Sequence, residues 1–188
     1  MEAGGRGAAG APGSRPLLVM LCTGNAARSV MAGAVLAETL PPDPATGELP
    51  VAVVTAGTHV VEGQPMSRRT RDALASVGFD APVHRSHQLT DDDVAAAQLI
   101  VAMAGEHVGY VRRRHPEAAG RTVTLRRLVR DLPSGPEPLE HRVAALDLAG
   151  VELEPWEDVT DPAGGEDPEY VACAREIATL ARQLAGRL

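Results

Sequence analysis

The sequence predicts an α/β fold: a single domain built on a four-stranded parallel sheet with helices on both faces. Short apolar runs of strand length alternate along the chain with longer stretches of helix length. Strands that alternate with helices in this way form parallel sheets covered on both sides. The length of 188 residues suits one domain with a substantial core.

The first half of the chain opens on a strand of five apolar residues, Leu17 to Leu21. An Ala/Met/Val/Leu-rich run from Arg28 to Leu40 predicts a helix, and the β-branched run from Val51 to Thr55 predicts the second strand. Ser67 is a suitable N-cap for the next helix, which ends before Gly78.

The second half repeats this alternation. Thr90 begins a helix, because the three aspartates after it stabilise the positive end of the helix dipole. Leu99 to Met103 (LIVAM) is the third strand. The remaining predicted elements are a helix over residues 106–114, a strand over 122–125, a basic helix to Asp131, a short helix near 139–148 and a long helix over 167–188.

Composition narrows the class of protein. The net charge of −7 argues against a general nucleic-acid-binding protein, because phosphate-backbone binding needs clustered positive charge. No apolar run reaches the length of a membrane span, so no membrane partner is expected. Residues 1–16 are Gly/Ala/Pro-rich and lack the core of a signal peptide; we expect a disordered extension before a domain of residues 17–188. A cytoplasmic protein with reduced thiols, monomeric or weakly dimeric, is expected.

The most informative stretch joins the first strand to the first helix. Cys22 ends the strand and Arg28 begins the helix, so backbone N–H groups, the helix N-terminus and a guanidinium surround a thiol. These groups stabilise a thiolate, the form of cysteine that attacks, and hold the non-bridging oxygens of a phosphoryl group. The alternative interpretation is a buried strand-end cysteine beside a helix-surface arginine.

The loop therefore predicts a phosphate-binding site. Gly24 and Asn25 most readily adopt the left-handed backbone angles that turn N–H groups inward. The residues expected to contact the oxyanion are Thr23, Gly24, Asn25, Ala26, Ala27 and Ser29. No Gly-Lys-Ser/Thr occurs, which excludes a nucleotide P-loop, and the histidines show no zinc spacing. Neither a metal nor a cofactor is expected.

Transfer of a phosphoryl group to sulfur needs a proton donor for the leaving oxygen and then a base for water. The best candidate is Asp161, because Pro162 restricts its backbone and the glycines after it let the loop fold over a pocket. A simple Asp-Pro turn before the last helix is the alternative.

The chain resembles the low-molecular-weight protein tyrosine phosphatase family, which includes related arsenate reductases. The similarity runs from about Leu17 to the C-terminus. It rests on CTGNAARS, TAGT at Thr55 to Thr58, HRSHQLT at His84 to Thr90, LIVAM and DPAGG. A cysteine early in the chain and an Asp-Pro pair late in it is the characteristic order of this family.

The resemblance implies Cys22 as nucleophile, Arg28 as phosphate binder and Asp161 as general acid and then base. It also implies a hydrogen-bond network that shapes the loop, formed here by Asn25, Ser29, Thr55 and His84. The resemblance thereby gives His84 a structural role in place of metal binding.

The chain departs from the family pattern around the nucleophile. Ala27 replaces a second loop cysteine and Val30 a proline, while Ala26 and Ala163 stand where relatives carry a bulky aliphatic and an aromatic residue. Without the second thiol we expect oxidation of Cys22 to be less reversible. The loop Thr58 to Gly63 (THVVEG) also offers no tryptophan or tyrosine, so two aromatic walls are missing and we expect a wider, less selective pocket.

Three functions fit these residues. The first is a phosphatase for phosphomonoesters, whose substrate is a phosphorylated protein (on tyrosine or a related residue) or a small phosphorylated compound. The second is an arsenate reductase coupled to a low-molecular-weight thiol, which needs only Cys22. The third is a catalytically weak phosphate-binding regulatory module, against which the intact Cys22, Arg28 and Asp161 argue.

Two other features have structural interpretations. Cys173 falls on the apolar face of the last helix and is interpreted as a core residue. A basic cluster is interpreted as a solvated helix surface, and steering of an anionic partner toward the site is the alternative. Its members are Arg112, Arg113, Arg114 and His115, with Arg126, Arg127 and Arg130.

Overall fold

A computed structural model of the chain describes residues 15–188 and confirms the predicted α/β fold. Four strands form one parallel sheet in the order β2-β1-β3-β4. Their bounds are β1 Leu17–Cys22, β2 Ala52–Gly57, β3 Leu99–Ala102 and β4 Thr122–Thr124. The expected N-terminal extension lies, apart from Arg15 and Pro16, outside the described residues.

Seven α-helices occur in the described part of the chain. They are α1 Arg28–Thr39, α2 Arg68–Ser76, α3 Asp91–Ala96, α4 Gly105–Arg114, α5 Leu125–Asp131, α6 Leu139–Ala144 and α7 Asp167–Ala185. The predicted caps form: Ser67 accepts a hydrogen bond from the N–H of Thr70, and Thr90 forms a capping box with Asp93. The short helix expected near 139–148 is shorter, and Asp147 after it is left-handed with φ 46°.

Three 3₁₀ helices between residues 15 and 188 were not predicted. They are η1 Pro116–Arg121, η2 Leu148–Gly150 and η3 Pro155–Glu157. Such short turns have no hydrophobic period for a sequence pattern to detect. None of the helices among residues 15–188 is long and apolar enough to cross a membrane.

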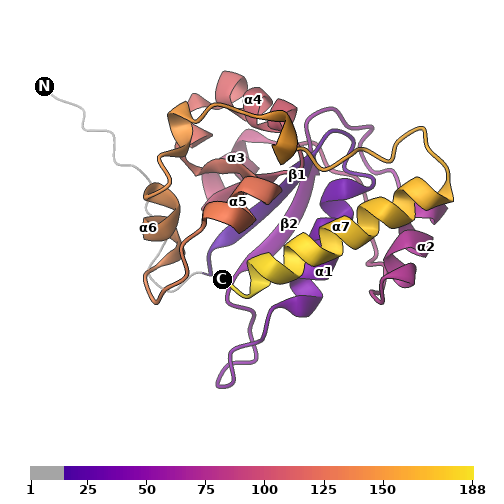
Figure 1. Cartoon of the computed structure of the whole chain (residues 1–188), viewed down its shortest axis with the longest axis horizontal. Helices are drawn as coiled ribbons and strands as arrows, with labels where there is room; N and C mark the ends of the chain where they lie inside the picture. Colours follow the sequence, from indigo (N-terminus) through magenta and orange to yellow (C-terminus); the bar gives the residue numbers. More distant parts are fainter. Residues whose placement is uncertain (1–14) are drawn as a thin grey trace, which may run out of the picture.

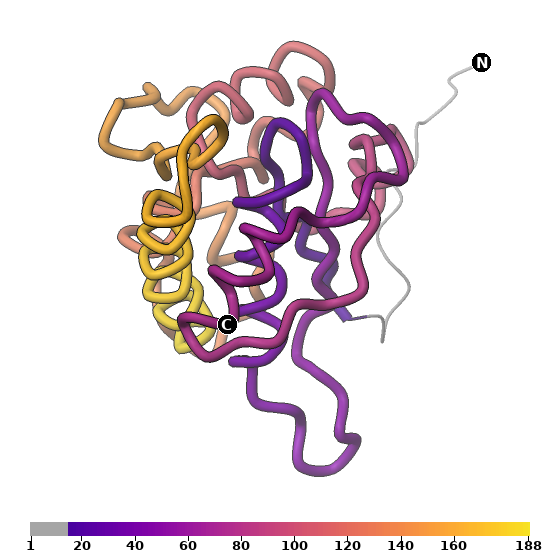
Figure 2. Tube along the Cα trace, turned by 90° about the vertical axis from the view of Figure 1, so that its right-hand side faces the viewer, coloured from indigo at the N-terminus to yellow at the C-terminus, as the bar shows by residue number. Residues whose placement is uncertain are grey.

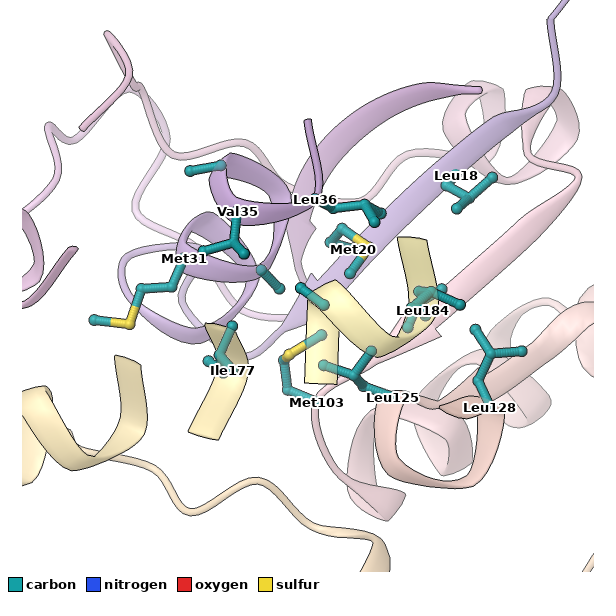
Figure 3. Packing of buried hydrophobic residues seen from close by; sticks show 14 of the residues in the cluster. Leu18, Met20, Met31, Val35, Leu36, Met103, Leu125, Leu128, Ile177 and Leu184 are labelled. Carbon is teal, nitrogen blue, oxygen red and sulfur yellow. The ribbon is translucent and has the colours of Figure 1, made fainter. Parts of the chain in front are cut away.

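The central strand β1 is buried on both faces. Leu18 and Met20 point into a large core with α1, α5 and α7, where Figure 3 shows them near Leu36 and Leu184. Val19 and Leu21 point into a smaller core on the opposite face, with side chains from α3 and α4. This alternation explains why the strand reads as a continuous apolar run, and it places helices on both faces of the sheet (Figure 1).

The topology puts Cys22 at the carboxyl end of the central strand, directly opposite Gly57 of β2. In open parallel sheets, ligands bind beyond this end. The link between α1 and β2 projects from the body of the molecule at the start of β2, as Figure 2 shows, and so lies at the other end of the sheet. The fold therefore directs attention to the loop after Cys22.

Candidate active site

The Cys22 thiol lies at the base of the loop between β1 and α1, and it is buried. Its Sγ is 3.0 Å from the Ser29 hydroxyl oxygen. The Asn25 amide nitrogen donates to that same oxygen at 3.0 Å, so the serine hydrogen is available to the sulfur. A hydroxyl directed at the thiol stabilises the thiolate.

Asn25 fixes the shape of the loop. Its backbone is left-handed, with φ 48°, as expected for the residue that turns N–H groups inward. The His84 ring Nε2–H donates to the Asn25 carbonyl oxygen at 2.7 Å, and the His87 backbone N–H donates to the Asn25 side-chain oxygen at 2.8 Å. His84 thus contacts the loop that the sequence predicted it would support.

The loop also rests on β2. The N–H of Thr58 donates to the Cys22 carbonyl at 2.9 Å, and the N–H of His59 donates to the Thr23 carbonyl at 2.9 Å. Gly57 makes this approach possible, since a Cβ there would lie 2.5 Å from the Thr23 carbonyl oxygen. A glycine is therefore required where β2 ends.

Thr55 is placed differently from its predicted role. It lies on β2 with its methyl group against Gly33 of α1, where a Cβ would meet it at 2.6 Å. Among the described residues its side chain makes no hydrogen bond to the Cys22 loop. The contact of Thr55 is thus with the helix that follows the loop, while Thr58 and His59 make the hydrogen bonds to the loop itself.

Arg28 is the first residue of α1 and reaches back over the loop. Its guanidinium donates to the Val159 carbonyl at 3.3 Å and to the Thr23 hydroxyl at 3.4 Å. It also forms an ion pair with Asp161. The guanidinium is buried, with 5% of its side chain exposed, whereas the Asp161 side chain is 44% exposed.

The Asp161-Pro162 segment therefore lies against the loop that follows Cys22. The Asp161 carboxylate accepts a hydrogen bond from the Ala163 N–H at 3.0 Å, which orients the carboxyl group. The N–H of Val159 donates to the carbonyl of Met103 at 2.8 Å and ties this segment to the end of β3. Residues 133 positions apart in the chain thus share one site.

A cavity of about 110 Å³ lies at this meeting point. Its lining residues are Cys22, Ala26, Ala27, Arg28, Ser67, Thr70, Asp161, Ala163 and Tyr170. Five of these are predicted site residues, and the three alanines leave the cavity with small walls. Tyr170 of α7 supplies one aromatic side chain to the wall of the cavity.

Several supporting residues were not predicted. The Thr70 hydroxyl donates to the Ala26 carbonyl at 3.0 Å. His107 is buried with its Nε2 2.9 Å from the Thr23 hydroxyl, and Glu106 accepts from that hydroxyl at 3.3 Å. Burial, with the nearby charge of Arg28, lowers the pKa of His107 to about 3, so its ring is neutral. These contacts join distant segments, and no local pattern marks them.

The comparisons with known proteins agree on one family. The sequence model described as "Low molecular weight phosphotyrosine protein phosphatase" matches residues 17–140. A protein-arginine-phosphatase of Geobacillus stearothermophilus is 31% identical over 171 residues, which are 91% of this chain and 95% of that protein. A probable low molecular weight protein-tyrosine-phosphatase, EpsP, of Ralstonia solanacearum is 33% identical over 108 residues, covering 57% of this chain and 69% of that protein.

Solved structures agree with this result. The YwlE arginine phosphatase from Geobacillus stearothermophilus superposes with a TM-score of 0.69 at 30% identity, covering 91% of each chain. A low molecular weight protein tyrosine phosphatase from T. tengcongensis has a TM-score of 0.69 at 27% identity, covering 92% of this chain and 99% of that one.

Proposed function

Because the chain belongs to the low molecular weight phosphotyrosine protein phosphatase family, we propose that it hydrolyses phosphorylated protein residues through a cysteinyl-phosphate intermediate. One observation carries the proposal. Cys22, Arg28 and Asp161 come from opposite ends of the chain and line one small cavity. A nucleophile, a phosphate-binding cation and a carboxyl group are what the two chemical steps need.

In the first step the Cys22 thiolate attacks phosphorus in line with the leaving oxygen. Arg28 and the loop N–H groups hold the three non-bridging oxygens. A phosphoryl group bound to Arg28 competes with Asp161 for the guanidinium, so the displaced Asp161 carboxylate takes up a proton from solvent and then donates it to the leaving oxygen. The S–P bond forms as the P–O bond breaks, and the proton leaves Asp161 with the product alcohol.

In the second step water attacks the cysteinyl phosphate. Asp161, now a carboxylate, accepts a proton from that water, and phosphate departs as the S–P bond breaks. The electron pair returns to sulfur, and the hydroxyl of Ser29 donates to the thiolate that leaves. The same hydrogen bond thus serves Cys22 as nucleophile and as leaving group.

Phosphoarginine is a second candidate substrate. The relative named as a protein-arginine-phosphatase aligns over 91% of the chain, while the tyrosine-phosphatase relative EpsP aligns over 57%. In the cavity, Ala26 and Ala163 form small walls, so a flat aromatic ring meets little stacking surface from them. Neither substrate requires a change in the roles of Cys22, Arg28 and Asp161.

Hydrolysis of p-nitrophenyl phosphate tests the proposal. The wild-type chain should turn this substrate over, and Cys22→Ser should abolish turnover because a serine hydroxyl is a far weaker nucleophile here. Cys173→Ser is the matched control: burial raises the pKa of that thiol to about 12, so it stays neutral and activity should persist. Full activity in Cys22→Ser would refute the mechanism, and phosphate binding without any turnover in the wild type would indicate a binding module.

A further inference from the structure

A second hollow lies beside the active-site loop, between the segment after β2 and helix α4. This groove has a volume of about 660 Å³ and is lined by residues that include Thr58, His59, Val60, Val61, Tyr110 and Arg114. Its wall is joined to the nucleophile loop, because the N–H groups of Thr58 and His59 donate to the Cys22 and Thr23 carbonyls. The groove therefore begins next to the site of chemistry.

Helix α4 gives the groove its direction. Glu106, Tyr110 and Arg114 are spaced four residues apart and share one face of the helix. Glu106 contacts the Thr23 hydroxyl at 3.3 Å, which marks the end nearest the active site. Eight residues of helix rise by about 12 Å, so Arg114 stands about that far along α4 from Glu106, which lies at the Thr23 hydroxyl just outside the groove. An extended peptide covers this distance in about four residues.

The groove carries a positive charge without a partner. Arg114 is exposed, and within residues 15–188 its guanidinium makes no ion pair or hydrogen bond. Arg112 two positions earlier differs, since it donates to the carbonyls of Leu148 and Val151. The remaining wall mixes polar side chains, Thr58 and Gln88, with apolar and aromatic ones. Val61 is 72% exposed, and the His59 and Tyr110 rings meet edge-on at 5.7 Å.

We propose that this groove binds the polypeptide of the phosphorylated substrate beside its phosphorylated residue, with an acidic side chain about four positions away paired to Arg114. The inference rests on the proposed function, because it needs a protein substrate in the Cys22 cavity. Charge complementarity selects the occupant: the chain as a whole carries a net charge of −7 and repels acidic segments, so the unpaired guanidinium of Arg114 favours their binding at this end of the groove.

Two phosphotyrosine peptides test the proposal. They differ only in carrying glutamate or glutamine about four positions to each side of the phosphotyrosine. The wild-type enzyme should have a kcat/KM about two- to fivefold higher for the glutamate peptide, through a lower KM, as expected for an exposed ion pair. Arg114→Ala should remove this preference, and Arg114→Glu should transfer it to a peptide with lysine at the same positions.

Arg113→Ala is the matched control, since Arg113 is exposed, adjacent and of the same charge but does not line the groove. It should retain the preference. Equal kcat/KM for the two peptides in the wild type, or an equal loss of preference in Arg113→Ala, would overturn the inference while leaving the proposed function intact. A wild-type enzyme that fails on p-nitrophenyl phosphate would overturn both.

Discussion

At the scale of single residues, each member of the site owes its position to a contact made elsewhere in the chain. Arg28 is held by the carbonyl of Val159 and the carboxylate of Asp161, both close to the start of the last helix. The cysteine and arginine could be recognised from their spacing, and the aspartate from Asp-Pro followed by glycines. The neutral His107 behind Thr23 could not, since a lone histidine after a strand carries no pattern.

The role of Asp161 can be measured through the leaving group. Asp161→Asn should lower kcat/KM by about 100-fold or more for phenyl phosphate, whose poor leaving group needs a proton. The loss should be smaller for p-nitrophenyl phosphate, because p-nitrophenolate departs more readily without one. Asp92→Asn, an exposed acid on α3, is the control. An equal loss for both esters would mean that Asp161 is not the general acid.

The alanine at position 27 leads to a prediction about the oxidation of Cys22. It lines the cavity with Cys22, and the other cysteine of the chain, Cys173, is buried on α7. Peroxide should oxidise Cys22 past the sulfenic acid, so a thiol reductant should restore little activity to the wild type. Ala27→Cys should recover far more, because a neighbouring thiol traps the sulfenic acid as a disulfide. Complete recovery in the wild type would contradict this account of Ala27.

At the scale of elements, the sequence predicted every strand and most helices, because periodicity and caps report on local structure. The sheet order, with β1 between β2 and β3, depends on which apolar runs pair with one another, and no single run determines it. The close contact of β2 with the nucleophile loop is of the same kind. In the sequence, the one sign of this contact was Gly57 in TAGT. The position of the Thr23 carbonyl explains why a glycine is needed there.

Gly57→Ala tests that contact. The added methyl group would lie 2.5 Å from the Thr23 carbonyl oxygen and 2.9 Å from the Asn25 nitrogen, so loop and strand must separate. We expect a loss of about 1–3 kcal/mol in the free energy of unfolding, as for other overpacked sites, and a large loss of kcat. Gly120→Ala, where a Cβ meets nothing within 4 Å, should leave both unchanged. Wild-type activity in Gly57→Ala would show that the loop is not held in this way.

His87 links the loop region to α3 through charge. Its ring lies 2.8 Å from Asp93 and 3.3 Å from Glu62. Burial opposes its protonation, but the hydrogen bonds to Asp93 and Glu62 outweigh burial and raise its pKa above the ordinary 6.5. A group whose pKa is raised by folding stabilises the fold fully at lower pH, and this contribution is lost as the pH rises through the raised pKa.

The expected size is small, below about 1 kcal/mol, because the ring is 42% exposed and solvent screens the pair. Urea unfolding of the wild type and of His87→Gln should therefore differ most near about pH 6, and the difference should shrink toward about pH 9. A difference that grows with pH would contradict the assigned direction.

At the scale of the whole molecule, the fold joins two distant segments over one end of the sheet. In the proposed mechanism the β1–α1 loop supplies the nucleophile and the phosphate-binding groups, and the segment before α7 supplies the acid. Sequence reasoning found both parts because each carries a recognisable motif. It missed the walls between them, Ser67, Thr70 and Tyr170, since these reach the cavity only through the packing of α7 against α1 and of α2 against α7.

The central claim is that phosphate passes through Cys22. Asp161→Ala slows the second step, so a rapid acid quench of this variant during turnover of p-nitrophenyl phosphate should trap the intermediate. Peptide mapping by mass spectrometry should then find one phosphoryl group, on the peptide that contains Cys22, and none in Cys22→Ser. Continued turnover with no phosphorylated cysteine, or a phosphoryl group on another residue, would contradict the account.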